Sequence, residues 1–212
     1  MIIESFAVPP FEKNAYVLGC ETTSEAVVID PGDEVDQVIA AVTRRGLHVR
    51  YILLTHSHLD HVSGCNQAKR AFAAPLVLHR DDLFLYERVV QQGIAFGHRV
   101  EVQPPIDLWF DPGVTWTFGD YEVAVHHTPG HSPGQVCLQV GRSGTTGTDL
   151  FVGDTLFAGS VGRTDLPVGD HATLLRSIRD VLLPLGDACL VYPGHGPATT
   201  IGQERMTNPF LR

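Results

Sequence analysis

Three histidines and an aspartate lie within six residues, directly after a short apolar strand pattern. The segment Thr55-His56-Ser57-His58-Leu59-Asp60-His61 follows the strand predicted over residues 51–55 (YILLT). In an extended chain, side chains two apart project to the same side, so His56 and His58 would share one side. Asp60 and His61 follow where the chain turns into a helix. A solvated polar loop is the alternative, but such a density of imidazole and carboxylate groups is costly without a metal or pairing partners.

Three further turns repeat one pattern, in which an apolar strand ends in a glycine-containing turn with one potential ligand. They are Thr128–Gly134 with His131, Phe151–Thr155 with Asp154, and Tyr192–Pro197 with His195. Glycine permits a tight backbone turn and a close approach to an ion, and strand ends are rigid supports for ligands. A single histidine after Pro-Gly is usually only a turn residue. Three such turns beside the HxHxDH segment favour one shared metal site.

Strand and helix patterns alternate along the chain, which predicts an α/β protein. Apolar runs bounded by turn residues predict strands over residues 14–19, 26–30, 51–55, 76–79, 150–152 and 188–192. Helical periodicity predicts helices over residues 34–45, 62–72, 81–92 and 171–183. Short strands and turns alternate over residues 106–140, and residues 143–148 are typical of a hairpin turn. No linker is visible, so we expect a single domain over residues 1–212.

Charge and composition exclude several classes of partner. The 212 residues carry a net charge of −9 and no basic stretch, so neither a nucleic acid nor a membrane is expected as a partner. The N-terminus lacks a signal-peptide pattern and no apolar run is long enough to span a bilayer. The four cysteines are dispersed, which fits small core residues in a reducing compartment. The expected localisation is therefore cytoplasmic.

The motifs together resemble the metallo-β-lactamase-fold hydrolases, and the resemblance covers essentially the whole chain. Within that superfamily the chain is most similar to the glyoxalase II-like branch. The similarity lies in GDTLF at residues 153–157, GRTD at 162–165, GHGP at 194–197, and the ending with ER at 204–205 and NPFL at 208–211. The resemblance implies an α/β fold, an αββα sandwich of two mixed β-sheets flanked by helices.

The resemblance also implies a set of metal ligands. One metal would be held by His56, His58 and His131. A second would be held by Asp60, His61 and His195, and Asp154 would bridge both. Nitrogen and oxygen ligands without cysteine suit Zn²⁺, one or two per chain, and also Fe or Mn. Binuclear occupancy is a hypothesis.

The implied activity is hydrolysis of a thioester of the S-lactoylglutathione (hydroxyacylglutathione) type by a metal-bound hydroxide. A thiolate leaves without a dedicated general acid because thiols have a pKa near ~8.5. Asp60 is the candidate that orients the water or takes its proton. The substrate would be a small anionic thioester, and Arg163 is a candidate contact, although an internal pair with Asp165 is an equal alternative. Asp30 is interpreted as a turn residue in preference to a support of the HxHxDH loop.

Only 17 residues follow His195, whereas full-length glyoxalase II enzymes carry a C-terminal helical extension that holds glutathione. This difference bears on the exact substrate. Residues 81–97 are interpreted as a packed helix in preference to a lid over the metals. The sequence carries no signal for an oligomeric state.

The strongest alternative is a persulfide dioxygenase acting on glutathione persulfide. These enzymes also resemble the chain, and they use mononuclear iron, which His56, His131 and Asp154 would hold here. The GHGP segment is more similar to the hydrolases. A non-enzymatic scaffold is a further alternative, but it predicts the loss of one or more ligands, and all seven are present.

Overall fold

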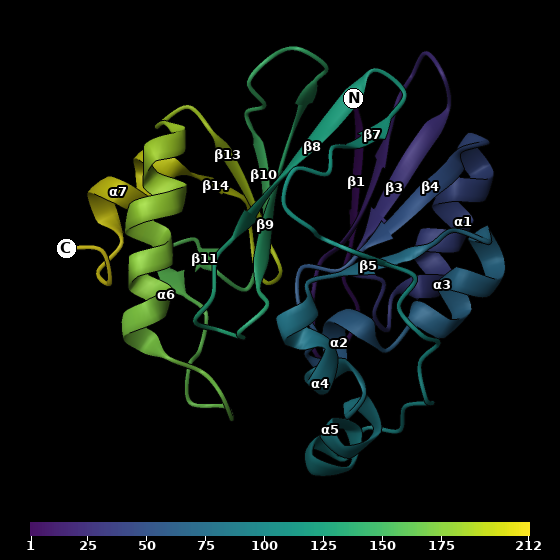
Figure 1. The fold of residues 1–212 in the computed structure, drawn as a ribbon, viewed down its shortest axis with the longest axis horizontal. Helices are drawn as coiled ribbons and strands as arrows, with labels where there is room; N and C mark the ends of the chain where they lie inside the picture. The colour runs from purple at the N-terminus through teal and green to yellow at the C-terminus, as the bar shows by residue number, and fades with distance from the viewer. The chain divides into compact units, whose positions relative to one another are not determined.

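The computed structural model describes residues 1–212, which divide into two compact units, Met1–Asp120 and Tyr121–Arg212. Each unit contains a mixed β-sheet with helices packed on it (Figure 1). This confirms the α/β class with two mixed sheets. The prediction that residues 1–212 form a single domain stays a prediction.

The first unit is built on a sheet in which the strands follow one another in chain order, β1-β2-β3-β4-β5-β6. The first three strands are antiparallel neighbours, and β3 to β6 run parallel. The strands are β1 (Ile2–Phe6), β2 (Ala15–Gly19), β3 (Glu25–Ile29), β4 (His48–Leu53), β5 (Leu76–Leu78) and β6 (Leu108–Trp109), followed by β7 (Trp116–Phe118). Parallel neighbours need crossover segments, and most of the helices of this unit lie in them.

The helices of the first unit follow the apolar periodicity of the sequence. They are α1 (Val35–Arg45), α2 (Leu59–Val62), α3 (Cys65–Phe72), the 3₁₀ turn η1 (Arg80–Asp82), α4 (Leu83–Tyr86) and α5 (Val89–Phe96). Helix α1, predicted over residues 34–45, buries Val35, Val38 and Val42 and is followed by Gly46, whose φ of 62° is left-handed. The helices predicted over 62–72 and 81–92 are each interrupted. Gly64 separates α2 from α3, and a Cβ there would lie 2.3 Å from the Gly32 carbonyl oxygen.

In the second unit, strands β14-β13-β10-β9-β8 are successive neighbours in one sheet. Strands β8 (Tyr121–His127), β9 (Val136–Arg142) and β10 (Asp149–Gly153) are antiparallel, β10 and β13 (Leu190–Pro193) are parallel, and β14 (Thr199–Thr200) is antiparallel to β13. Residues 143–148 join β9 to β10, as the predicted hairpin turn requires. Strands β11 (Leu156–Phe157) and β12 (Ser160–Val161) form a small hairpin.

Helices α6 (His171–Ser177) and α7 (Ile201–Thr207) complete the second unit (Figure 1). Helix α6 continues as a π-helical turn, η2 (Ile178–Leu182), and a 3₁₀ turn, η3 (Leu183–Leu185). It buries Leu174, Ile178 and Leu182. Ala172, at the start of the helix, is exposed.

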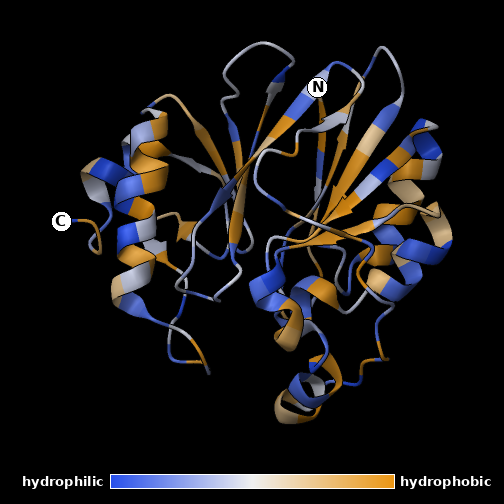
Figure 2. Cartoon of the chain, viewed as in Figure 1, coloured by the Kyte–Doolittle hydropathy of each residue, from blue (hydrophilic) through white to orange (hydrophobic).

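Hydrophobic residues recur along the strands and helices (Figure 2), and most of the buried residues are of this kind. In the first unit the core clusters join β2, β3, β4 and β5 to α1 and α3. In the second unit one cluster joins β9, β10 and β13 to α6. All four cysteines are free and buried, which confirms that they serve as small core residues. None of the helices has the length and apolar character needed to cross a membrane.

Candidate metal centre

The first unit places His56, His58, Asp60 and His61 in one compact group directly after β4. The rings of His56 and His58 are perpendicular with centroids 4.8 Å apart, and those of His56 and His61 are 4.0 Å apart. Ligand atoms of His56 and His58 lie within 4.8 Å of each other, as do those of Asp60 and His61. The three imidazoles are buried, whereas the Asp60 side chain keeps 15 % exposure. The four side chains of the HxHxDH segment are therefore as close together as the sequence predicts.

Asp30, directly after β3, forms hydrogen bonds with His61 of this group and with Thr55 beside it. Its Oδ1 accepts from the Thr55 N–H at 2.7 Å, and its Oδ2 accepts from the Thr55 hydroxyl at 2.6 Å. The same Oδ2 lies 2.9 Å from Nδ1 of His61. Because a carboxylate only accepts hydrogen bonds, His61 donates through Nδ1–H and keeps its Nε2 lone pair for an ion. The interpretation of Asp30 as a mere turn residue is therefore wrong, since its carboxylate contacts the HxHxDH loop.

A buried ion pair holds the Asp30 turn in place. The Lys13 ammonium donates to the Asp30 main-chain oxygen and to Glu34 Oε1, and Lys13 and Glu34 are only 1 % and 2 % exposed. Glu34 Oε1 also accepts from the Gly32 N–H at 2.8 Å. Gly32 itself lies against the loop, because a Cβ there would come within 1.9 Å of the Asp60 carbonyl oxygen. Sequence analysis missed Lys13 and Glu34, because no local pattern marks an ion pair across 21 residues.

The second unit places His131, Asp154 and His195 together at three strand ends. His131 lies in the turn between β8 and β9, Asp154 follows β10, and His195 follows β13. Asp154 Oδ2 is 3.5 Å from Nε2 of His131 and 3.6 Å from Nε2 of His195. His131 and Asp154 are buried, and His195 is one-third exposed. The carboxylate thus stands between the two imidazoles, a position that suits a bridging ligand.

The segment after Asp154 fixes the orientation of His131. Nδ1 of His131 donates to the Arg163 main-chain oxygen at 2.7 Å, so Nε2 carries the lone pair. Gly162 lets the segment pass close to the main chain of Asp154, because a Cβ there would lie 1.8 Å from the Asp154 carbonyl oxygen. The Arg163 guanidinium forms a two-pronged pair with Asp165 at 2.7 and 2.8 Å. This hydrogen bonding lowers the pKa of Asp165 to about 2. The role of Arg163 in contacting substrate stays a prediction.

The C-terminal helix α7 supports the neighbouring hairpin through Glu204, which is 1 % exposed. Its carboxylate accepts from the Gly159 N–H at 2.8 Å and from the Asn208 amide at 2.9 Å. Asn208 in turn donates to the Ser160 carbonyl at 2.9 Å. The hairpin carries Phe157, whose ring meets that of His195 edge-on at 6.2 Å. Glu204 and Asn208, near the end of the chain, therefore hold the hairpin that lies beside His195.

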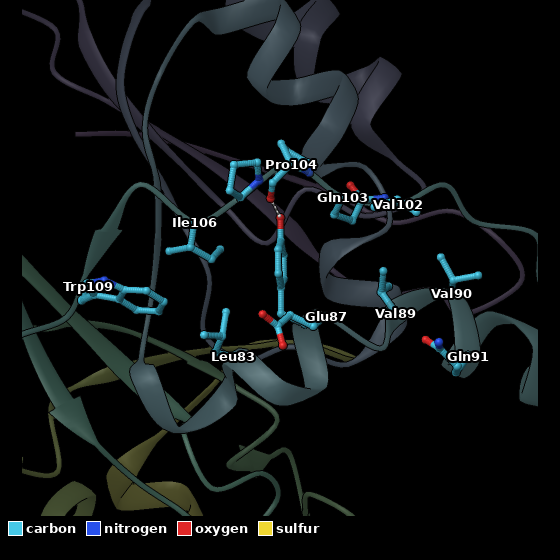
Figure 3. A pocket seen from close by; sticks show the side chains of 12 residues that line it. Leu83, Glu87, Val89, Val90, Gln91, Val102, Gln103, Pro104, Ile106 and Trp109 are labelled. Carbon is cyan, nitrogen blue, oxygen red and sulfur yellow. Dashed lines mark hydrogen bonds between the residues drawn. The ribbon is translucent and has the colours of Figure 1, made fainter.

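Residues 81–97 are partly packed and partly exposed. Tyr86 and Val89 belong to the core of the first unit, while Ile94 and Phe96 are exposed. The segment forms one wall of an apolar pocket of about 640 Å³, with Trp109 and residues 102–106 opposite (Figure 3). The Tyr86 hydroxyl donates to the Pro104 carbonyl at 2.8 Å, and burial raises its pKa. The predicted single helix is thus three short helical pieces that pack on the core through one face.

The remaining histidines near the site bind structural partners. His127 Nε2 lies 2.8 Å from the Pro133 carbonyl oxygen, within the turn that carries His131. His126 Nε2 lies 2.9 Å from Oε1 of Gln139 on the neighbouring strand. In both units the candidate ligands offer imidazole nitrogen and carboxylate oxygen only. Donors of this kind suit Zn²⁺, Fe or Mn, and the fixed Nδ1–H bonds of His61 and His131 are those of metal-binding histidines.

Comparisons with known proteins place the chain in a family. The model of the metallo-beta-lactamase superfamily matches residues 8–195. The hydroxyacylglutathione hydrolase GloC of Haemophilus influenzae is 38 % identical over 214 residues, which cover 100 % of this chain and 98 % of that protein. The crystal structure of the BLEG-1 B3 metallo-beta-lactamase has a TM-score of 0.89 and 38 % identity over 99 % of both chains. That of TTHA1623 in a di-iron-bound form has a TM-score of 0.85 and 40 % identity over 98 % and 100 % of the two chains. These matches confirm the predicted fold, and the chain belongs to the metallo-beta-lactamase superfamily of metal-dependent hydrolases.

Proposed function

We propose that the protein is a thioesterase that hydrolyses small anionic thioesters of the hydroxyacylglutathione type. The observation that carries this proposal is the pair of ligand sets, one per unit, in which His61 and His131 each donate through Nδ1–H and so carry the lone pair on Nε2. The name of the Haemophilus influenzae relative, which is similar over its full length, supports the substrate class.

In this proposal both ligand sets serve one binuclear centre. His56, His58 and His131 would hold one ion, Asp60, His61 and His195 would hold the other, and Asp154 would be a ligand shared by both. The family model spans both sets, and all seven residues are present in the family's order. Zn²⁺ is the proposed metal. Iron is the alternative that the di-iron form of TTHA1623 favours.

Metal ions with such ligands supply a nucleophile at neutral pH by lowering the pKa of bound water towards ~7, and they polarise a carbonyl. The residues of the chain orient the reaction. We assign to Asp60, whose partly exposed carboxylate has its Oδ2 3.6 Å from Nε2 of His61, the role of orienting the attacking water or accepting its proton. The thiolate leaves without a proton donor, because the pKa of a thiol is near ~8.5. The chain therefore needs no separate general acid.

The local charge is compatible with an anionic substrate although the chain carries −9 overall. Two divalent ions would outweigh the carboxylates of Asp60 and Asp154 at the site. Arg163 is a proposed substrate contact, which would require its guanidinium to exchange Asp165 for the substrate carboxylate. The side chains of Arg163 and Asp165 are 57 % and 68 % exposed, which leaves room for that exchange.

Elemental analysis combined with an activity panel tests the proposal. Purified protein loaded with zinc or with iron is offered S-lactoylglutathione and glutathione persulfide, with thioester loss and O₂ consumption followed in parallel. We expect thioester hydrolysis and about two metal ions per chain. Oxygen uptake with the persulfide and an intact thioester would instead establish the iron dioxygenase alternative. Asp60→Asn should lose most of the hydrolysis, whereas Asp36→Asn, at an exposed carboxylate on α1, should keep it.

A further inference from the structure

The backbone that carries His56 and His58 is held by side chains rather than by a sheet. Strand β4 ends at Leu53 and α2 begins at Leu59, so residues 56–58 lie between regular elements; together with Leu59 we call them the ligand strap. The Ser57 N–H donates to Asp82 Oδ2 at 2.9 Å. The Leu59 N–H donates to Gln92 Oε1 at 3.0 Å, and the Gln92 amide donates back to the Ser57 carbonyl at 3.0 Å. These three bonds lie on either side of His58 and next to His56.

Asp82 and Gln92 are themselves fixed. Asp82 is fully buried at the start of α4. Gln92, on α5, donates a second hydrogen bond to the Leu85 carbonyl at 2.9 Å, which ties it to α4. A buried main-chain group that loses its hydrogen-bond partner is destabilising, so the strap has a strong preference for this one arrangement.

We propose that Asp82 and Gln92 are positioning residues that hold His56 and His58 ready to bind metal. The inference rests on the metal centre of the proposed function and adds two residues that lie outside its ligand set. A ligand fixed before the ion arrives loses less conformational freedom on binding, and partners behind ligands commonly account for 10–100-fold in metal affinity. The two residues act through the strap and make no contact with substrate.

The neighbouring glutamine provides a matched control. Gln91 and Gln92 are consecutive on α5, but Gln91 lines the apolar pocket (Figure 3) while Gln92 bonds the strap. Gln91→Leu and Gln92→Leu are therefore the same chemical change on the same helix. Asp81 and Asp82 form a second matched pair, since Asp81 is exposed and Asp82 is buried.

The test is zinc affinity, measured by competition with a chromophoric chelator, together with the melting temperature of the metal-free protein. We expect Gln92→Leu and Asp82→Ala to bind zinc about 10–100-fold more weakly than the wild type. Gln91→Leu and Asp81→Ala should bind as tightly as the wild type. Asp82→Asn should largely rescue the affinity, because its Oδ1 can still accept from the Ser57 N–H. A merely structural role would lower the melting temperature and leave zinc affinity unchanged.

Equal zinc affinity of folded Gln92→Leu, Gln91→Leu and wild type would overturn the proposal. If Gln92→Leu does not fold, Gln92→Glu replaces it, because it keeps the acceptor for Leu59 and loses the amide donor. It should weaken zinc binding relative to Gln91→Glu, and equal binding would again overturn the proposal. A wild-type chain that binds no zinc would remove both this proposal and the metal centre. Normal zinc binding without thioester hydrolysis would remove only the proposed substrate.

Discussion

Replacing Asp30 by asparagine should weaken metal binding without removing any metal ligand. The wild-type hydrogen-bond chain has a defined direction. The Thr55 hydroxyl donates to Asp30 Oδ2, so the Thr55 oxygen accepts from Nδ1 of His56, 3.1 Å away. His61 donates its Nδ1–H to the same Oδ2. One carboxylate therefore sets the tautomers of two ligands, and both keep Nε2 free of a proton.

An asparagine at position 30 reverses this chain. Its single acceptor must face the Thr55 N–H, which can only donate, so the amide group faces Thr55 Oγ1 and Nδ1 of His61. His61 must then accept at Nδ1 and carry its proton on Nε2. The Thr55 hydroxyl turns to donate to His56, with the same result there. Position 30 has a φ of 50°, which asparagine tolerates well, so the backbone is preserved.

The magnitude follows from two ligands that must change tautomer before they bind. Loss of a partner behind a ligand costs about 10–100-fold in metal affinity, or about 1.4–2.7 kcal/mol, and in the binuclear arrangement each ion loses one such ligand. Thr55→Val interrupts only the branch to His56, so it should affect one ion and leave the other. Zinc titrations of the wild type and both variants measure these losses. Long-range ¹H–¹⁵N spectra of the metal-free proteins report the tautomers directly. Unchanged tautomers in Asp30→Asn, or wild-type affinity for both ions, would refute the reasoning.

Three further substitutions test other parts of the structure. Lys13→Met leaves the Glu34 carboxylate buried without its cation and should cost about 3–5 kcal/mol in urea unfolding. Adding Glu34→Gln should recover part of that loss, and a double variant as unstable as the single one would contradict this. Gly162→Ala drives a Cβ against the Asp154 carbonyl oxygen, so elemental analysis should find fewer ions per chain, and full occupancy would argue against that contact. Burial outweighs the hydrogen bonds that the Cys137 thiol forms with the hydroxyls of Thr128 and Thr155, and it raises the pKa of the thiol to about 11. Because the pKa of this thiol is higher in the folded state, its contribution to the free energy of unfolding is complete below the unfolded-state pKa of ~8.5–9 and is lost as the pH rises towards 11. Between pH 7 and pH 10 the free energy of unfolding should therefore fall by about 1.4 kcal/mol less for Cys137→Ala than for the wild type.

The positions of the candidate ligands could be predicted from the sequence because each follows a strand with a strong local pattern. The turn residues beside His131, Asp154 and His195 end apolar runs, and β10 and β13 end at the residue before Asp154 and two residues before His195, respectively. The family resemblance supplied the sheet arrangement, which periodicity alone does not. Helix α1 was predictable for the same local reasons, namely its apolar face and its terminal Gly46.

The groups behind the ligands could not be predicted, because they contact the strap across long stretches of sequence. Asp82 is 25 residues from Ser57, and Gln92 is 33 residues from Leu59. Helical periodicity over residues 81–92 favours one helix. The structure breaks it, with Asp82 at the start of α4 and Gln92 on α5, both bonded to the strap. Tertiary hydrogen bonds outweigh helix propensity here, since propensity differs by less than ~1 kcal/mol per residue.

The hydrogen bonds of Asp82 and Gln92 to the ligand strap, and the hydrogen bonds of Asp30 and Thr55, prepare the ligands of the first unit in two different ways. Asp82 and Gln92 fix where the main chain of residues 56–59 runs, while Asp30 and Thr55 fix which nitrogen of each ring carries the proton. The two tasks are separable, because backbone position and ring tautomer depend on different atoms. Asp82→Ala should therefore weaken metal binding without changing the tautomers, and Asp30→Asn should change the tautomers with the strap in place. Combining the two variants should give nearly additive losses, because the altered groups share no hydrogen bond.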